Sequence, residues 1–309
     1  MQMKATLYYR NKLDEHDRKI YDDLVSKWMR FDKNITIGVP HCGFADLTQA
    51  VHFDYPLLFY INYYQIAYGR SIFGLHIRGD YLYGKEEAKE MLDRCEQWGN
   101  YILKNLPAGG EAEKALWLHD VILNNVRYSE ENGIRAHNMA GVVCDGIAVC
   151  EGISMAYKFL CDLAGIPCIF VSGTLNGSPH AWNMVWIHNT PSFVDVTNDG
   201  SGSGRFDRTH FLRKSSEMAG YVWDRELIPE GRLTNKSSAY KTAHSREEVR
   251  KILSGLGKNE TATVHLQFGY PLDRREIEQM LGMLCLTNPL LIARDILFAE
   301  ESQMIFIRG

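Results

Sequence analysis

Three residues of the types used in nucleophilic catalysis follow one another in the middle of the chain: Cys150, His180 and Asp195. Cys150 stands where an amphipathic helix is expected to begin, because apolar residues recur at helical spacing over 153–164 before Gly165 and Pro167 end the pattern. A thiol at a helix N-terminus meets unpaired backbone N–H groups and the positive end of the helix dipole, which favour its thiolate form. The arrangement indicates acyl-transfer chemistry.

Such a site needs a thiolate, a base that moves a proton and donors for the oxyanion. We predict that Cys150 is the nucleophile and that His180 is the base, which later protonates the leaving amine while a carboxylate orients its ring. The backbone N–H of Cys150 is one expected oxyanion donor, with Tyr128 or Asn183 as candidates for the second. Gly152 is expected to let a substrate approach the helix start. By strand alternation Trp182 shares the face of His180, which predicts core packing and a place in the wall of the site.

The residues alone leave the choice of carboxylate open. If Asn189-Thr190 is the turn of a two-residue hairpin, His180 lies opposite Asp199. If His188-Asn189 is the turn, Asp195 becomes the diagonal neighbour of His180. Both carboxylates share the face of His180, so register does not decide between them.

Composition narrows the function classes. The 309 residues carry a net charge of −4 and are 45% hydrophobic, which gives no reason to expect nucleic acid or an acidic membrane as a partner. No apolar run approaches the roughly 18 residues needed to span a bilayer, and residues 1–19 lack the apolar core of a signal peptide. Seven cysteines, an odd number spread thinly, favour free thiols in a reducing compartment, and we expect a cytoplasmic protein.

The elements that must position the three residues follow from periodicity and from turn residues. An α+β fold is expected, with a helical N-terminal region. We predict helices at 13–31, 45–52, 85–105, 111–126 and 150–164, and strands at 35–39, 71–78, 80–83, 167–173, 180–187 and 193–197. Ser245 to Glu248 form a capping box that opens a separate small α/β appendage. The predicted division is 1–84 for an N-terminal α/β region packed on the core, 85–240 for the catalytic core and 245–309 for the appendage.

Five motifs in order resemble the transglutaminase-like superfamily, and the likeness extends to its bacterial members over about 85 to 225. They are Cys150-Glu151-Gly152-Ile153-Ser154, Ala164-Gly165-Ile166-Pro167, Val171-Ser172-Gly173, His180-Ala181-Trp182-Asn183 and Val194-Asp195-Val196-Thr197. The resemblance implies a papain-like fold, in which a cysteine-bearing helix packs on an antiparallel sheet. It assigns the catalytic roles to Cys150, His180 and Asp195, and so prefers Asp195 to Asp199. The chain departs from the family pattern at Ile153, where an aromatic is usual, and at Asn198, where many bacterial relatives carry tryptophan.

Members of that family include cross-linking enzymes, proteases, deamidases and peptide amidases, and some have lost activity. We predict a cysteine-dependent acyl-transfer enzyme that acts on peptide or protein amides without metal or cofactor. Hydrolysis is preferred to cross-linking because the segment Gly200 to Gly204 indicates a flexible, open site edge and no calcium-loop pattern is present. The alternative is a non-catalytic protein- or peptide-binding module that keeps the scaffold. In either case residues 245–309 could dock a protein partner.

Overall fold

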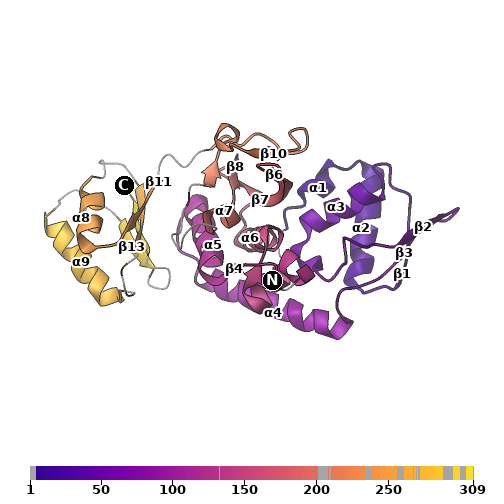
Figure 1. Ribbon diagram of the computed structural model, residues 1–309, viewed down its shortest axis with the longest axis horizontal. Helices are drawn as coiled ribbons and strands as arrows, with labels where there is room; N and C mark the ends of the chain where they lie inside the picture. Colours follow the sequence, from indigo (N-terminus) through magenta and orange to yellow (C-terminus); the bar gives the residue numbers. More distant parts are fainter. Residues whose placement is uncertain are drawn as a thin grey trace. The chain divides into compact units, whose positions relative to one another are not determined.

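In the computed structural model the chain divides into two units, Met1–Leu233 and Thr234–Gly309 (Figure 1). The structure describes residues 5–131, 133–200, 208, 210–233, 238–255, 261–266, 268, 270, 272–287, 295–299 and 304–308. Within these ranges no helix is both long and apolar enough to cross a bilayer. The segment expected to be flexible lies, from residue 201 to 204, outside the described residues.

A helix packed on an antiparallel sheet forms the centre of the larger unit, and this confirms the predicted α+β class. The helix is α6 (Cys150–Ala164), which is buried along most of its length. The sheet has the strand order β10-β6-β7-β8-β9, and each neighbouring pair is antiparallel. Its strands are β6 (Cys168–Leu175), β7 (Ser178–Ile187), β8 (Thr190–Val194), β9 (Phe211–Arg213) and β10 (Tyr221–Trp223).

Local sequence explains where these elements begin and end. Gly165 adopts a left-handed conformation with φ 74° and ends α6, as glycine commonly does at this position. His188 and Asn189 both have positive φ and form the two-residue turn between β7 and β8, so that Ile187 pairs with Thr190. The hairpin therefore has the second of the two registers that the sequence left open.

Two long helices precede α6, close to their predicted bounds. They are α4 (Lys85–Lys104) and α5 (Glu111–Asn125). Gly99 lets α4 approach α6 closely, because a Cβ there would lie 2.5 Å from a methyl carbon of Leu163. Shorter elements complete this part: β4 (Arg127–Tyr128) paired with β5 (Ile147–Ala148), α7 (Val196–Gly200), 3-10 helices at Gly133–His137 and Ser215–Glu217, and a π-helical turn at Gly141–Asp145.

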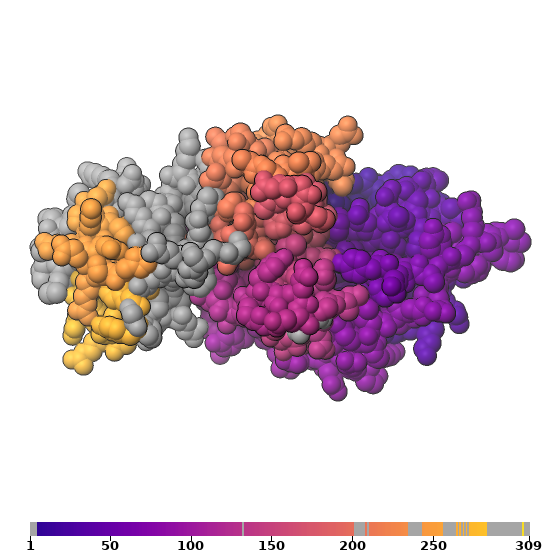
Figure 2. Space-filling view, viewed as in Figure 1, coloured from indigo at the N-terminus to yellow at the C-terminus, as the bar shows by residue number. Residues whose placement is uncertain are grey.

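The N-terminal region belongs to the same unit and packs on the core. Figure 2 shows its indigo residues adjoining the magenta and red residues of the core without a visible break. The ring of Phe53 lies 4.6 Å from that of Phe170 on β6, and the hydroxyl of Tyr9 donates to the carbonyl of Phe170. The elements are α1 (Tyr8–Lys12), α2 (Glu15–Met29), β1 (Asn34–Ile37), α3 (Phe44–Asp54), a 3-10 helix at Pro56–Leu58, β2 (Tyr68–Ser71) and β3 (Gly74–Arg78).

Of the two strands predicted here, the one at 71–78 was correct in part and the one at 80–83 was wrong. The first is β3 over Gly74–Arg78, while Ile72 and Phe73 form the turn of a hairpin whose other strand, β2, ends at Ser71. Gly74 follows the turn with φ 125°, and a Cβ at this position would lie 2.1 Å from the carbonyl oxygen of Ile37. Residues 80–83 contribute only an isolated bridge, at Tyr81.

In its described residues the smaller unit contains a four-stranded sheet, two helices and an apolar core of its own. Its strand order is β11-β12-β14-β13, and the core includes Val249, Leu253, Val264 and Ile305. Its elements are β11 (Ser238–Ala243), α8 (Arg246–Ser254), β12 (Thr261–Leu266), α9 (Arg274–Thr287), β13 (Asp295–Ala299) and β14 (Met304–Arg308).

Two predictions about the start of this unit can be compared with the structure. The predicted capping box is present in part: Glu248 N–H donates to Ser245 Oγ (3.2 Å), but Glu248 Oε2 accepts the backbone N–H of His244 (2.7 Å) instead of that of Ser245. The unit begins before residue 245, because β11 pairs with β12.

Candidate active site

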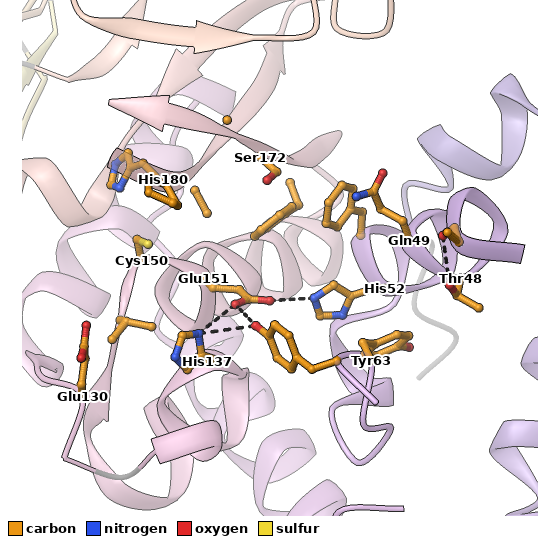
Figure 3. A pocket seen from close by; sticks show the side chains of 18 of the residues that line it. Thr48, Gln49, His52, Tyr63, Glu130, His137, Cys150, Glu151, Ser172 and His180 are labelled. Carbon is orange, nitrogen blue, oxygen red and sulfur yellow. Dashed lines mark hydrogen bonds and ion pairs between the residues drawn. The ribbon is translucent and has the colours of Figure 1, made fainter. Parts of the chain in front are cut away.

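Cys150 is the first residue of α6 and lines a cavity of about 720 Å³. Val149 before it is extended, and the thiol-bearing residue is partly exposed to solvent. As the first helical residue, Cys150 has a backbone N–H without an intrahelical acceptor. His180 lines the same cavity, and Figure 3 shows the two side chains near each other at one end of it.

His180 on β7 is held by Asp195. Its Nε2 lies 2.7 Å from Asp195 Oδ2, with the imidazole 11% exposed and the carboxylate fully buried. Burial alone would lower the pKa of His180, but its hydrogen bonds to Asp195 and Cys150 outweigh burial and raise the pKa to about 9. Because Nε2 faces Asp195, Nδ1 is the nitrogen left for Cys150. The structure thus brings the three predicted residues together, with the histidine favoured as imidazolium.

Asp195 does not lie in a strand, and the predicted strand at 193–197 was wrong beyond Val194. β8 ends at Val194, and Asp195 immediately precedes the short helix α7. Its Oδ1 accepts the backbone N–H of Asn198 at 3.0 Å, as an aspartate at a helix N-cap does. The carboxylate is thereby fixed to the backbone on one side while its other oxygen faces His180.

Trp182 packs against the imidazole ring of His180. It is fully buried, and its ring stacks against that of His180 with centroids 5.8 Å apart. Trp182 is not among the residues that line the cavity. Its predicted core packing is confirmed, whereas its predicted place in the wall of the site is not.

Two of the residues expected to assist the site have structural roles instead. A Cβ on Gly152 would lie 2.5 Å from the carbonyl oxygen of Ala136, so this glycine makes room for the protein's own backbone rather than for a substrate. Asn183 is fully buried, and its amide nitrogen donates to the carbonyls of Ser154 (3.0 Å) and Ile169 (3.2 Å). Its amide N–H groups therefore bond to the backbone of the protein and do not point to an oxyanion.

Tyr128 does line the cavity and is 51% exposed. It stays a candidate for the second oxyanion donor.

A cluster that sequence reasoning missed surrounds Glu151, the residue after the cysteine. His52 Nε2 lies 2.8 Å from Glu151 Oε1, while His137 Nδ1 (3.0 Å) and the hydroxyl of Tyr64 bond to Oε2 (Figure 3). Burial would raise the pKa of Glu151, but the hydrogen bonds from His137 and His52 lower it to about 2. The bond to Glu151 in turn raises the pKa of His137. The cluster is therefore a partly buried carboxylate held by two imidazoles and a tyrosine hydroxyl.

The wall of the cavity opposite Cys150 and His180 comes from the N-terminal region. Ala45, Gln49 and His52 of α3 line it together with Tyr63 and Tyr64. In Figure 3 Gln49 and His52 lie on the side away from Cys150 and His180. In the sequence this wall is marked by a tyrosine-rich run at 60–64, which does not by itself indicate a cavity.

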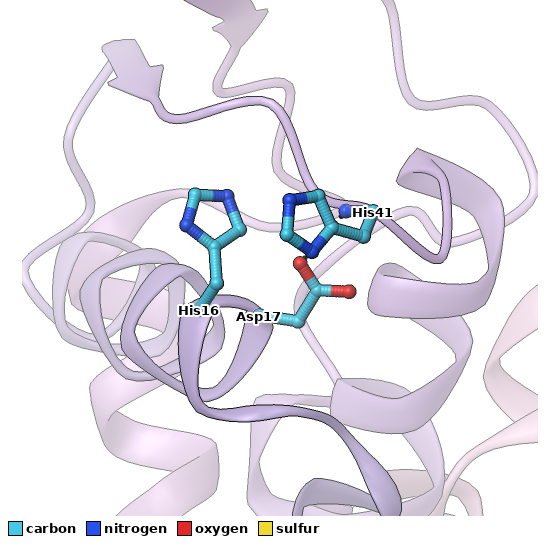
Figure 4. Close-up of side chains that lie close together, drawn as sticks. All are labelled: His16, Asp17 and His41. Atoms are coloured by element: carbon cyan, nitrogen blue, oxygen red, sulfur yellow. Dashed lines mark hydrogen bonds between the residues drawn. The ribbon is translucent and has the colours of Figure 1, made fainter.

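A second group of potential ligand atoms lies away from this cavity, on His16, Asp17 and His41 (Figure 4). The imidazoles of His16 and His41 stack with their planes 18° apart, and Asp17 accepts the backbone N–H groups of His41 and Cys42. Because the two rings are stacked face to face, with centroids 4.3 Å apart, their in-plane nitrogen lone pairs lie in separate, nearly parallel planes and do not converge on one point. We therefore assign no metal to this group.

Comparison with known proteins places part of the chain in a family. The Transglutaminase-like superfamily matches residues 97–197. Residues 97–197 are a transglutaminase-like domain. They include the helix of Cys150, the strand of His180, and Asp195. No curated protein matches the chain.

Solved structures similar to this chain include a TGase, with 15% identity over 59% of this chain and 52% of that one (TM-score 0.34). Another is a putative cysteine protease from Cytophaga hutchinsonii, with 18% identity over 46% and 49% (TM-score 0.31). The chain thus spans about half the length of these proteins. We base no inference on similarities at this level.

The transglutaminase-like domain does not contain the whole candidate site. The wall formed by residues 45–64 precedes it, and Tyr221, whose hydroxyl lies 2.6 Å from Asp195 Oδ2, follows it. Neither contribution was predicted from the sequence.

Proposed function

We propose that this protein is a cysteine-dependent acyl-transfer enzyme that hydrolyses amides of peptides or proteins. The observation that carries the proposal is the 2.7 Å bond between His180 and Asp195 in the cavity that Cys150 shares. A structural cysteine does not need an imidazole held in this way, whereas a nucleophilic cysteine does.

The chemistry would proceed in two steps. The Cys150 thiolate attacks the amide carbonyl carbon, and the backbone N–H of Cys150 stabilises the oxyanion. The imidazolium of His180 gives its proton to the leaving nitrogen, so that ammonia or an amine departs and a thioester remains. Water then gives a proton to His180 as it attacks the thioester, and the carboxylic acid product and free thiol are released. Asp195 stabilises the imidazolium in both steps.

The cavity limits what can bind. Its volume of about 720 Å³ lies within the range of roughly 300–1,000 Å³ typical of small-molecule sites. A glutamine side chain or a few residues of a peptide would fit, whereas a folded protein could present only a terminus or a loop. Among the described residues that line the cavity none is Lys or Arg, while Glu130 and Glu151 are acidic. His52, His137 and His180 also line the cavity and offset these carboxylates, so the charge of the lining does not select between acidic and basic substrates.

Water is the proposed acyl acceptor. Cross-linking requires a thioester protected from water while an amine enters. Cys150 is partly exposed, which supports access of water to the thioester.

The test is release of ammonia or peptide from glutamine-containing peptides and peptide amides without added calcium. Slow release by the wild type, its loss in Cys150→Ala and its retention in the matched control Cys144→Ala would support the proposal. Incorporation of cadaverine faster than hydrolysis at millimolar amine would make the enzyme a cross-linking transglutaminase. Peptide binding without turnover, equal in wild type and Cys150→Ala, would favour a binding module.

A further inference from the structure

Asp195 receives a hydrogen bond that the proposed reaction does not require. The hydroxyl of Tyr221 on β10 donates to Asp195 Oδ2 at 2.6 Å, and the same oxygen faces Nε2 of His180 at 2.7 Å. Tyr221 is only 6% exposed and lies beyond the transglutaminase-like domain. Two donors therefore share one carboxylate oxygen, one of them the catalytic imidazole.

The direction of this bond is fixed by a neighbour. Asn198 Nδ2 lies 2.9 Å from Tyr221 Oη and, as an amide nitrogen, can only donate. The tyrosine oxygen thus accepts from Asn198, and its own proton points to Asp195. Nδ2 of Asn198 also contacts Nε2 of His210 (3.1 Å), which must then accept, while Nδ1 of His210 donates to Asp199 Oδ1 (2.9 Å).

Among the described residues, the other charged side chains near Asp195 form ion pairs with one another and not with Asp195. On α5, His119 is fully buried between Asp120 Oδ1 and Asp199 Oδ2, at 3.1 Å from each. Burial would lower the pKa of His119, but the two carboxylates raise it. Arg208 Nε lies 2.6 Å from Asp120 Oδ1. The carboxylate of Asp195 therefore interacts with His180 on β7, with Tyr221 on β10 and with the backbone N–H of Asn198 on α7.

We propose that Tyr221 is a positioning residue of the triad, whose hydroxyl fixes Asp195 and withdraws part of its charge from His180. A carboxylate that accepts a second strong hydrogen bond stabilises the imidazolium less than one that does not. Tyr221 would thereby set the upper pH limit at which His180 stays protonated and Cys150 stays paired with it. For turnover this inference rests on the proposed function, but for Cys150 reactivity it does not.

Tyr221→Phe in the full chain tests the proposal, with iodoacetamide alkylation of Cys150 followed from pH 5 to pH 10. Without the hydroxyl, Asp195 binds the imidazolium more strongly, so the basic limb of the profile should move up by about half a pH unit. Turnover at the optimum should fall by about tenfold, the loss expected when one hydrogen bond to a charged group is removed. A loss of packing alone would lower rates without moving the limb.

Tyr81→Phe is the matched control, because its hydroxyl also donates one hydrogen bond, to the carbonyl of Asp32, away from the cavity. It should leave the limb in place. If Tyr221→Phe does not fold, Asn198→Ala is the variant to test. It removes the hydrogen bond that Asn198 donates to the Tyr221 hydroxyl, and it should move the basic limb of the pH profile in the same direction by a smaller amount. An unmoved limb in the folded variant, or an equal shift in Tyr81→Phe, overturns the proposal. If no substrate is turned over but the limb moves, the proposed function fails and the role of Tyr221 stands.

Discussion

His52 of α3 lies 2.8 Å from the carboxylate of Glu151, the residue next to the proposed nucleophile. Through this bond the N-terminal region is joined to the start of the cysteine-bearing helix. Tyr64, from the same region, bonds to the other oxygen of Glu151. The far wall of the cavity and the nucleophile are thus connected by one carboxylate.

Replacement of Glu151 should cost stability in a pH-dependent way. The pKa of Glu151 is about 2 in the folded state, below its ordinary value of about 4.3, so its stabilisation is present above pH 4.3 and is lost as pH falls toward 2. The pKa of His137 is raised, so the stabilisation that its ion pair with Glu151 contributes is present below about pH 6.5 and is lost at higher pH. Glu151→Gln should therefore lower the free energy of unfolding by about 1–3 kcal/mol near pH 5.5 and by less at pH 2.5 or 9.

Urea unfolding at the three pH values measures this difference. Glu130→Gln, an exposed glutamate that lines the same cavity, is the control and should change stability little. A penalty for Glu151→Gln that is the same at all three pH values would show that its charge is not involved.

Substitution of the two buried aspartates, Asp195 and Asp199, should have different effects, the first on turnover and the second on stability. Asp195→Asn keeps the shape but removes the charge that holds His180, and turnover should fall on the order of a thousandfold or more. Asp199→Asn should instead cost about 3–5 kcal/mol of stability, because Asp199 is fully buried against His119. Thermal unfolding and turnover are measured on both variants. A folded Asp199→Asn protein that is as inactive as Asp195→Asn would contradict the assignment.

Filling the cavity from α3 should impair substrate binding but not thiol chemistry. Ala45 lines the cavity, and Ala45→Trp should raise KM by about tenfold or more, while small iodoacetamide still reaches Cys150. Asp46→Trp, on the same helix but outside the lining, is the control. Equal effects of both variants on KM would mean that this wall does not contact the substrate.

The smaller unit should be dispensable for the chemistry. Its core is separate, and none of the catalytic candidates lies within it. A protein ending at Leu233 should fold and keep selective alkylation of Cys150. The cut belongs after Leu233 and not at the predicted boundary between residues 240 and 245, because β11 pairs with β12 of the smaller unit. A folded truncation product that loses this selectivity would show that residues 234–309 contribute to the site.

Sequence patterns predicted the central fold because its signals are local. Helical periodicity and Gly165 predicted both ends of α6. For the hairpin the sequence offered two turns, and the structure has the one at His188-Asn189. The extended pattern misled at Asp195, where an N-cap interaction with Asn198 overrides the preference of the valines beside it for a strand. The hairpin at Ile72-Phe73 was missed because apolar residues occupy its turn.

The remainder of the site depends on contacts between distant segments. His52 and Tyr64 reach Glu151 across 99 and 87 residues of sequence, and Tyr221 reaches Asp195 across 26. No spacing rule links such positions, and each side chain alone is typical of a core or a surface. The likeness to a family indicated Cys150, His180 and Asp195 as candidates, while the residues that contact them became visible only in the structure.

The most direct test of the account is competitive labelling of the seven cysteines with limiting iodoacetamide at pH 6.5, followed by peptide mapping. Cys150 should be modified first, and His180→Ala should abolish this preference, because the imidazolium that pairs with the thiolate is then missing. Preferential labelling of Cys144 or another cysteine in the folded wild type would contradict the assignment of Cys150 as nucleophile. So would a preference for Cys150 that His180→Ala leaves unchanged.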